Sequence, residues 1–317
     1  MERMKRKKET KPKGRASAIL TADIHLTSAS PVSRTDNYIQ AQGDKLKFLQ
    51  ALSKKNNYCP ILCAGDVFDH WKASPWLCTW AHLNLPDNII TIPGNHDLPM
   101  NNIEQYEKSA LHLLEWVGDE IIVLENQWAD LLDTKVFGVP FNCAIGDFNE
   151  PKDKKARRIL MIHAMVWENK KPAWATAAYS AKELLDEYGD HFDLILTGDN
   201  HQSFVVDGGN SVLVNPGSMM RRTAEQEDFR PRCFLYYAED NSVEPVYFPI
   251  EENVHDVSHL DKKKERDARR EAYISKMKTA YSTNLSFKDN LQAFFAENQT
   301  PKKVREIIWA HLDPTKI

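Results

Sequence analysis

The sequence lacks the features that mark membrane, secreted and disulfide-rich proteins. No window in its 317 residues approaches the roughly 18 consecutive apolar residues that a membrane-spanning helix needs. Residues 1–15 contain no apolar segment of the signal-peptide type. Cysteine is scarce, with five residues and no CxxC spacing, which argues against a disulfide framework or a zinc ribbon. We therefore expect a reduced, cytoplasmic protein with no membrane partner.

Charge is distributed unevenly along the chain. The net charge is −4, yet residues 1–15 contain eight Lys or Arg residues and only two acidic ones, and the rest of the chain is acidic. Such a run is typical either of a solvated tail or of an arm that contacts a polyanion. We predict a basic, flexible arm at residues 1–15.

Apolar runs of the strand type alternate with helical patterns over residues 16–250. The chain has 42% apolar residues, enough for a full core. The alternation of strand and helix patterns predicts an α/β fold and a catalytic domain that spans residues 16–250. Helical patterns lie at 45–52, 104–116 and 181–188.

Polar residues directly follow five of the predicted strands. In α/β sheets the loops at the carboxyl ends of parallel strands lie along one rim, so these residues should converge there. Positions i and i+2 of an extended segment project to the same side, so that Asp23 and His25 can bind one metal ion. The five clusters are Asp23 and His25, Asp66, Asn95 and His96, His163, and Asp199 and His201.

These clusters predict a centre for two divalent metal ions. They supply seven donors if His96 is left out, which exceeds the four used by one tetrahedral zinc ion. Carboxylate, imidazole and amide donors without thiolate favour Mn²⁺, Fe²⁺ or Zn²⁺. Two such ions, sharing a carboxylate and a water, assist in-line attack on a phosphate. His96 is predicted to protonate the departing oxygen, and the predicted catalytic set also includes the next residue, Asp97.

Each of these residues has a simpler explanation when it is taken alone. A histidine after a strand is often a hydrogen-bonded structural residue, and an aspartate after glycine is often a turn former. Five such clusters at the ends of five strands favour a functional site, because the members of a site are judged jointly.

The five clusters resemble the five motifs of calcineurin-like metallophosphoesterases. Within that superfamily, residues 16–250 are most similar to the SbcD-type DNA-repair nucleases of bacteria and phages. The resemblance is carried by Thr21-Ala22-Asp23-Ile24-His25-Leu26, Ala64-Gly65-Asp66-Val67-Phe68-Asp69, Pro93-Gly94-Asn95-His96-Asp97-Leu98-Pro99, His163, Gly198-Asp199-Asn200-His201, and Asn215-Pro216-Gly217-Ser218 with Arg221-Arg222.

The resemblance implies a four-layer αββα sandwich that binds two Mn²⁺ ions, with His96 as the acid. One departure from the family pattern is Asp199, where relatives usually have histidine. A carboxylate can still bind Mn²⁺, but it adds a negative charge to the centre. The implied ligands are Asp23, His25, Asp66 and His201 for the first metal ion, and Asp66, Asn95, His163 and Asp199 for the second.

The resulting prediction is a Mn²⁺-dependent DNA nuclease, an exonuclease or endonuclease that acts in DNA repair, recombination or phage DNA metabolism. Two alternatives remain open. A phosphodiesterase or phosphatase acting on nucleotides or phosphoproteins would use the same metal centre with a different rim. A non-catalytic scaffold could use the same fold, although the intact ligand set argues against it.

Residues 251–317 are predicted to form a helical C-terminal extension. Apolar stripes at helical spacing begin after Ser286 and after Thr300-Pro301, which are favourable helix starts. Packing on the catalytic domain, as a reduced cap, and docking of a partner explain such stripes equally well. The resemblance implies an SbcC-like ATPase partner bound through residues 286–312, and a homodimer is the other expected assembly.

Overall fold

The computed structural model describes residues 14–118, 121–146, 148, 156–169, 171, 178–256, 269–272 and 287–311. The chain divides into two compact units, Met1–Asp256 and Val257–Ile317. Nearly all of the predicted basic arm lies outside the described residues. The first unit extends to Asp256 because its last residues pair with the segment before the first helix: the Asp256 amide donates to the Ser33 carbonyl.

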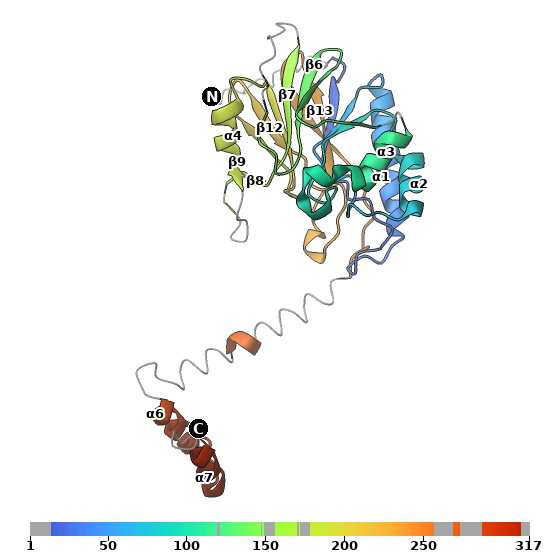
Figure 1. Cartoon of the computed structure of the whole chain (residues 1–317). Coiled ribbons are helices and arrows are strands. Elements are labelled where there is room, and N and C mark those ends of the chain that lie inside the picture. Colours follow the sequence, from blue (N-terminus) through green and yellow to red (C-terminus); the bar gives the residue numbers. More distant parts are fainter. Residues whose placement is uncertain are drawn as a thin grey trace, which may run out of the picture. The chain divides into compact units, whose positions relative to one another are not determined.

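Two six-stranded sheets form the first unit (Figure 1). The strand order is β14-β13-β1-β2-β3-β4 in the first sheet and β11-β12-β10-β7-β6-β5 in the second. In the first sheet β1 to β4 pair in parallel, and β13 pairs antiparallel with β1 and with β14. In the second sheet the four central strands pair in parallel and both edge strands pair antiparallel. The strands of the first sheet are β1 (Ala18–Thr21), β2 (Ile61–Cys63), β3 (Ile89–Thr91), β4 (Ile121–Val123), β13 (Arg232–Tyr237) and β14 (Ser242–Tyr247). Those of the second are β5 (Gln127–Asp130), β6 (Thr134–Val139), β7 (Arg157–His163), β10 (Leu194–Gly198), β11 (Phe204–Asp207) and β12 (Val212–Asn215), and β8 (Val166–Trp167) pairs with β9 (Tyr179–Ser180).

Helices cover the outer face of each sheet, with α1–α3 on one side and α4 on the other (Figure 1). Serine side chains accept hydrogen bonds at the starts of three of these helices, and Ser180 forms a capping box with Glu183 at the start of α4. The helices are α1 (Tyr38–Lys55), α2 (Pro75–Asn84), α3 (Ala110–Val117) and α4 (Ala181–Tyr188), with short 3-10 helices at Pro99–Asn101, Ile103–Lys108 and Ala224–Gln226.

The side chains of the central strands alternate between two cores. Ile19 of β1 packs under the helices, whereas its neighbour Leu20 packs between the two sheets. In β7, Ile159 faces the core between the sheets and Leu160 faces α4. A strand buried on both faces must be apolar at every position, which is why these runs lack the apolar–polar alternation of a half-exposed strand. The predicted four-layer αββα sandwich is confirmed.

One predicted helix differs in the structure. The pattern at 104–116 indicated a single helix, but the chain forms a 3-10 helix at Ile103–Lys108 and then α3. Ser109 breaks the helix because its backbone is extended, and its side chain accepts the amide hydrogen of His112 to start α3 anew. The patterns at 45–52 and 181–188 are confirmed as parts of α1 and α4.

The second unit contains α6 (Phe287–Glu297) and α7 (Lys302–His311), which confirm the two predicted C-terminal helices. They contact each other through Phe295 and Trp309, whose ring centroids lie 6.0 Å apart. Phe295 is buried, whereas several other apolar side chains of the two helices are exposed. Within the described residues, no helix combines the length and the apolar character needed to cross a membrane.

Candidate metal centre

The five polar clusters lie at the carboxyl ends of β1, β2, β3, β7 and β10 and converge where the two sheets meet. Imidazole and carboxylate donors form a first group, in which the Nε2 atoms of His25 and His201 are 3.0 Å apart. Asp23 Oδ1 lies 3.9 Å from the first of these nitrogens and 4.0 Å from the second. Residues from strands of both sheets thus face one point, as the sequence predicted.

A second group of donors adjoins the first through Asp66. Its Oδ2 lies 3.6 Å from His163 Nε2, and Asn95 Oδ1 lies 2.9 Å from the same nitrogen. The same Asp66 oxygen is 3.5 Å from His25 Nε2. Asp66 is therefore positioned to be shared by two cations, which is the role predicted for it.

The backbone around these donors is bent rather than extended. The φ angles are 50° at Asp23, 51° at His25, 55° at Asp66 and 78° at Asp199, all in the left-handed region. The expectation that Asp23 and His25 belong to one extended segment was therefore wrong, although both side chains do reach the centre. Such conformations cost about 1–3 kcal/mol each and are tolerated where they aim functional side chains.

Two glycines allow the donors to approach one another. A Cβ at Gly65 would lie 2.4 Å from His163 Nδ1, and a Cβ at Gly94 would lie 2.1 Å from Asp66 Oδ1. Any side chain at these positions would displace a donor. The Gly-Asp and Gly-Asn pairs of the sequence are thus parts of the site and not only turn formers.

The histidines present lone pairs to the site. His163 Nδ1 lies 2.6 Å from the Ala64 carbonyl, which can only accept, so Nδ1 carries the proton. Its Nε2 lone pair then points at two oxygen acceptors. Burial lowers the pKa of His25 to about 3 and the pKa of His201 to about 4, which favours the neutral imidazoles that bind metal ions.

The carboxylates fit the same interpretation. Burial raises the pKa of Asp23 to about 8 and raises the pKa of Asp66 well above its ordinary value, with neighbouring carboxylates adding to the effect. Among the described residues, Asp23 Oδ2 is buried without any hydrogen-bond partner. Buried acceptors of this kind are stabilised by cations. The donor set therefore fits divalent metal ions, which when bound supply an activated water and neutralise charge on a phosphate.

His96 is held at the edge of the centre through its backbone amide and one ring nitrogen. Its backbone amide donates to Asp66 Oδ1 at 2.9 Å, and its Nδ1 donates to the Asp69 carbonyl at 2.7 Å. The side chain is 41% exposed. Because Nδ1 is used, the predicted delivery of a proton to a substrate oxygen would fall to Nε2, and this role stays a prediction.

Asp97 has a different environment from His96. Its side chain is fully buried and accepts hydrogen bonds from the backbone amides of Val67, Phe68 and Gly94. These bonds tie the loop after β2 to the loop after β3, which carry Asp66 and His96. Asp97 was predicted as catalytic, but the structure assigns it a positioning role.

Asp69 belongs to the site although it was not predicted as a site residue. Its Oδ1 lies 3.5 Å from His25 Nδ1 and 2.5 Å from an Arg222 nitrogen. Burial raises the pKa of Asp69, but the neighbouring His25 ring and Arg222 guanidinium outweigh burial and hold the pKa below its usual range. The sequence signal that could have identified Asp69 was its position three residues after Asp66, in the motif Gly65-Asp66-Val67-Phe68-Asp69.

Asp199 is half-buried beside the donor groups. Its backbone amide donates to Asp23 Oδ1 at 3.1 Å, so its main chain orients one ligand. Within the described part of the chain, its carboxylate belongs to none of the groups whose donor atoms all lie within 4.8 Å of one another. Metal binding by the Asp199 side chain stays a prediction.

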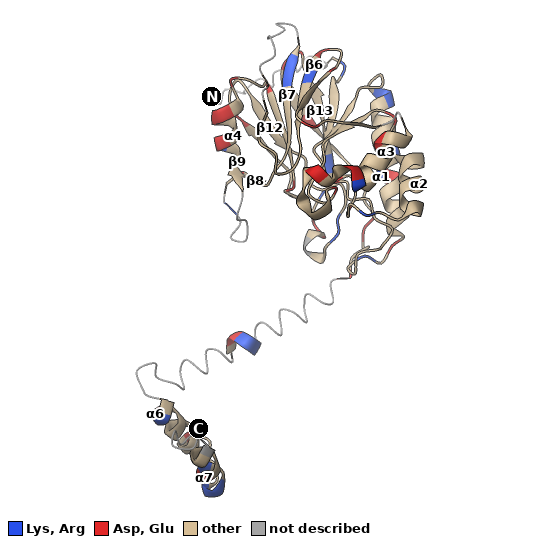
Figure 2. Cartoon of the chain, viewed as in Figure 1, with Lys and Arg blue, Asp and Glu red and all other residues tan. Residues whose placement is uncertain are grey.

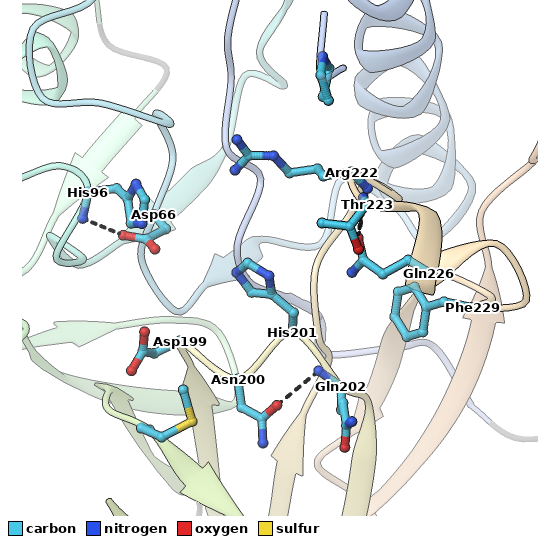
Figure 3. Close-up of a pocket in the computed structure, with 12 residues that line it drawn as sticks. Asp66, His96, Asp199, Asn200, His201, Gln202, Arg222, Thr223, Gln226 and Phe229 are labelled. Atoms are coloured by element: carbon cyan, nitrogen blue, oxygen red, sulfur yellow. Dashed lines mark hydrogen bonds between the residues drawn. The ribbon is translucent and has the colours of Figure 1, made fainter. Parts of the chain in front are cut away.

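A cavity of about 810 Å³ opens beside the two donor groups (Figure 3). Asp66, His96, Asp199 and His201 lie on one side, and the segment after β12 forms the opposite wall. The cavity is large enough for a nucleotide-sized ligand. The wall residues are Arg222, Thr223, Gln226 and Phe229, with Pro31, Met165, Asn200 and Gln202 completing the lining.

Comparison with solved structures finds many similar folds at low identity. The protein TT1561 of Thermus thermophilus is 14% identical, with 74% of this chain and 99% of that chain covered and a TM-score of 0.46. A novel archaeal phosphodiesterase is 13% identical (73% and 99% covered, TM-score 0.41). A putative 5'-nucleotidase from Staphylococcus aureus is 14% identical (78% and 58% covered, TM-score 0.45). These likenesses carry no information about the substrate.

Comparison by sequence is more decisive. No curated protein matches the chain significantly. Residues 17–214, however, match the family described as calcineurin-like phosphoesterase, and this stretch contains every predicted metal ligand. The chain therefore belongs to the calcineurin-like phosphoesterase family, the metal-dependent phosphoester hydrolases.

Proposed function

We propose that the protein is a Mn²⁺-dependent nuclease that hydrolyses phosphodiester bonds of DNA, in repair, recombination or phage DNA metabolism. The observation that carries the proposal is the position of His96, which lines an open cavity next to both donor groups while its Nδ1 is held by the Asp69 carbonyl. Cleavage of a DNA strand releases an alkoxide, which must be protonated as it departs. The choice of DNA is supported by the motif resemblance to SbcD-type nucleases.

The roles of the residues follow from their contacts. Asp66 lies between the two donor groups and fixes the His96 main chain through its other oxygen. Asp69 holds His96 and His25 in place through a carbonyl and a carboxylate oxygen. Asp97 joins the two loops that carry these groups. The mixture of carboxylate, imidazole and amide donors suits Mn²⁺, Fe²⁺ or Zn²⁺, and the motif resemblance to SbcD-type nucleases supports Mn²⁺ among these.

The test is digestion of end-labelled single- and double-stranded DNA with added Mn²⁺, run beside bis-p-nitrophenyl phosphate. We expect cleavage of both, and loss of both when the metal is chelated. Cleavage of the small diester with intact DNA would favour a phosphodiesterase of nucleotides. Activity confined to monoesters would favour a phosphatase, and no activity with Mn²⁺, Fe²⁺ or Zn²⁺ would favour a non-catalytic scaffold.

We also propose that the helical C-terminal extension docks an SbcC-like ATPase partner. Phe287, Phe294 and Val304 are exposed on α6 and α7. Basic residues gather at the start of α7 (Figure 2), so the surface combines apolar anchors with positive charge. Such a helical surface suits recognition by a partner groove.

Deletion of residues 257–317 tests this docking. We expect the truncated protein to cleave bis-p-nitrophenyl phosphate normally but to lose ATP-stimulated DNA degradation with an ATPase encoded beside it. Insolubility of the truncated protein would show instead that the helices belong to the catalytic unit. Light scattering of the same samples would test the predicted homodimer.

A further inference from the structure

The wall of the cavity opposite the metal centre contains one basic residue of the Lys or Arg type in the part of the chain that the structure describes, Arg222. Figure 3 shows its side chain extending from the wall towards the side of the cavity where Asp66 and His96 lie. Its guanidinium pairs with Asp69, whose Oδ1 lies 3.5 Å from His25 Nδ1. Arg222 therefore adjoins the place where chemistry is proposed to occur.

Among the described residues, the guanidinium group has one ion-pair partner. One of its nitrogens forms an ion pair with Asp69 Oδ1 at 2.5 Å, and the side chain is 23% exposed. A guanidinium has five N–H donors in a planar fork that matches the oxygens of a phosphate. Asp69 can therefore orient Arg222 while other donors remain available to an anion in the cavity.

The main chain leading to Arg222 is held by basic side chains from the region of α1. Lys45 is buried, and its Nζ donates to the Met219 carbonyl at 2.7 Å. A nitrogen of Arg34 donates to the Arg221 carbonyl at 2.8 Å. Burying a lysine is costly, and here the buried ammonium is used to fix the loop that carries Arg222.

Further bonds fix the residue itself. Ser33 Oγ donates to the Arg222 carbonyl at 2.7 Å. The Gln226 side-chain oxygen accepts from the amides of Arg222 and Thr223, at 2.7 and 3.2 Å. The backbone of Arg222 is thus held on both sides. A group fixed in this way binds a ligand with little loss of conformational freedom.

The electrostatics of the cavity explain why a cation is needed on this wall. Asp66 and Asp199 line the cavity. Asp69 forms an ion pair with Arg222, which also lines the cavity. A phosphodiester anion would meet these carboxylates unless positive charge faced it from more than one side. The metal centre supplies positive charge on one side when loaded, and Arg222 supplies it on the other.

We propose that Arg222 is a substrate-binding residue that donates hydrogen bonds to a non-bridging oxygen of the phosphate being hydrolysed. This inference rests on the proposed phosphodiesterase function, since it assigns the scissile phosphate to the space between Arg222 and the metal centre. Asp69 holds the guanidinium in the unliganded site and shares it with the phosphate in the complex.

Binding of inorganic phosphate to the Mn²⁺-loaded protein, measured by calorimetry, tests the proposal without turnover. Arg222→Gln should weaken binding by about 10- to 100-fold, the range for a lost hydrogen bond to a charged group. Arg222→Lys, which keeps the charge but loses the fork, should give an intermediate loss. Arg230→Gln removes an exposed arginine nearby that does not line the cavity, and it should bind phosphate normally.

Kinetics and metal analysis complete the test. Arg222→Gln should raise KM for both DNA and bis-p-nitrophenyl phosphate while retaining the bound Mn²⁺. Unchanged phosphate affinity would overturn the proposal. A loss of bound Mn²⁺ as large as the loss of phosphate binding would also overturn it, because Arg222 would then act only by holding Asp69. A KM effect confined to DNA would place Arg222 on a neighbouring phosphate instead. If the wild-type protein proves inactive but still binds phosphate through Arg222, the proposed function is refuted, whereas the contact between Arg222 and phosphate is not.

Discussion

Asp66→Asn is expected to lower the affinity for both metal ions by at least about 100-fold and to abolish phosphodiester cleavage. Replacing an outer-shell partner of a ligand already costs about 10- to 100-fold in metal affinity. Asp66 is predicted to be a direct ligand, since one of its oxygens faces His25 at 3.5 Å and His163 at 3.6 Å. Its replacement should therefore cost more than that of an outer-shell partner. An amide there keeps the shape but loses the charge that both donor groups share.

The measurement is metal analysis of the purified variant after dialysis against Mn²⁺. Asp186→Asn is a matched control, because it removes an exposed carboxylate on α4. Retention of two Mn²⁺ ions by Asp66→Asn would exclude the shared role of Asp66. Loss of one ion only would assign Asp66 to a single donor group.

Calorimetry provides an independent measurement on Asp66→Asn, the number of protons released when metal binds. The pKa of Asp23 is raised to about 8, mainly by burial, so this group holds a proton at pH 7 in the metal-free protein, and burial also raises the pKa of Asp66 well above its ordinary value. Metal binding requires the carboxylate forms and releases the protons that these groups hold. Mn²⁺ affinity should therefore increase as the pH rises towards about 8. Titrations in buffers with different ionisation enthalpies should show fewer protons released by Asp66→Asn than by the wild-type protein.

His96→Asn is expected to lower kcat on DNA by about 10²- to 10⁴-fold, the usual contribution of general acid catalysis, while both metal ions remain bound. The reason is that His96 lines the cavity with its Nδ1 engaged by the Asp69 carbonyl, which assigns proton delivery to Nε2. Asparagine can keep a hydrogen bond to that carbonyl, but it cannot deliver a proton.

The leaving group provides a sharper diagnosis. Bis-p-nitrophenyl phosphate releases p-nitrophenolate, which departs without protonation, so His96→Asn should lose much less activity on this substrate than on DNA. Equal losses on both substrates would refute the acid role. His191→Asn, at an exposed histidine after α4, controls for loss of an imidazole. Loss of Mn²⁺ from His96→Asn would instead make His96 a ligand, which its proximity to His25 and Asp69 allows geometrically.

The fold could be predicted because its signals are local. Ile19 and Leu20 enter different cores only because successive side chains of a strand point in opposite directions. A run that is apolar at both positions thus indicates a strand covered on both faces. The split of 104–116 could not be predicted from apolar spacing, since the cap at Ser109 competes with continuation of the helix.

The sequence by itself determined which side chains reach the rim, because Asp66, for example, follows its strand wherever that strand lies in the sheet. The tertiary structure alone decided what each side chain does there. Asp97 is adjacent to His96 in the chain, yet it is buried under three backbone amides. Arg222 meets Asp69 across a long separation in the chain. Roles of this kind depend on distances and burial between residues remote in sequence, and these are set by how the two sheets and their loops pack.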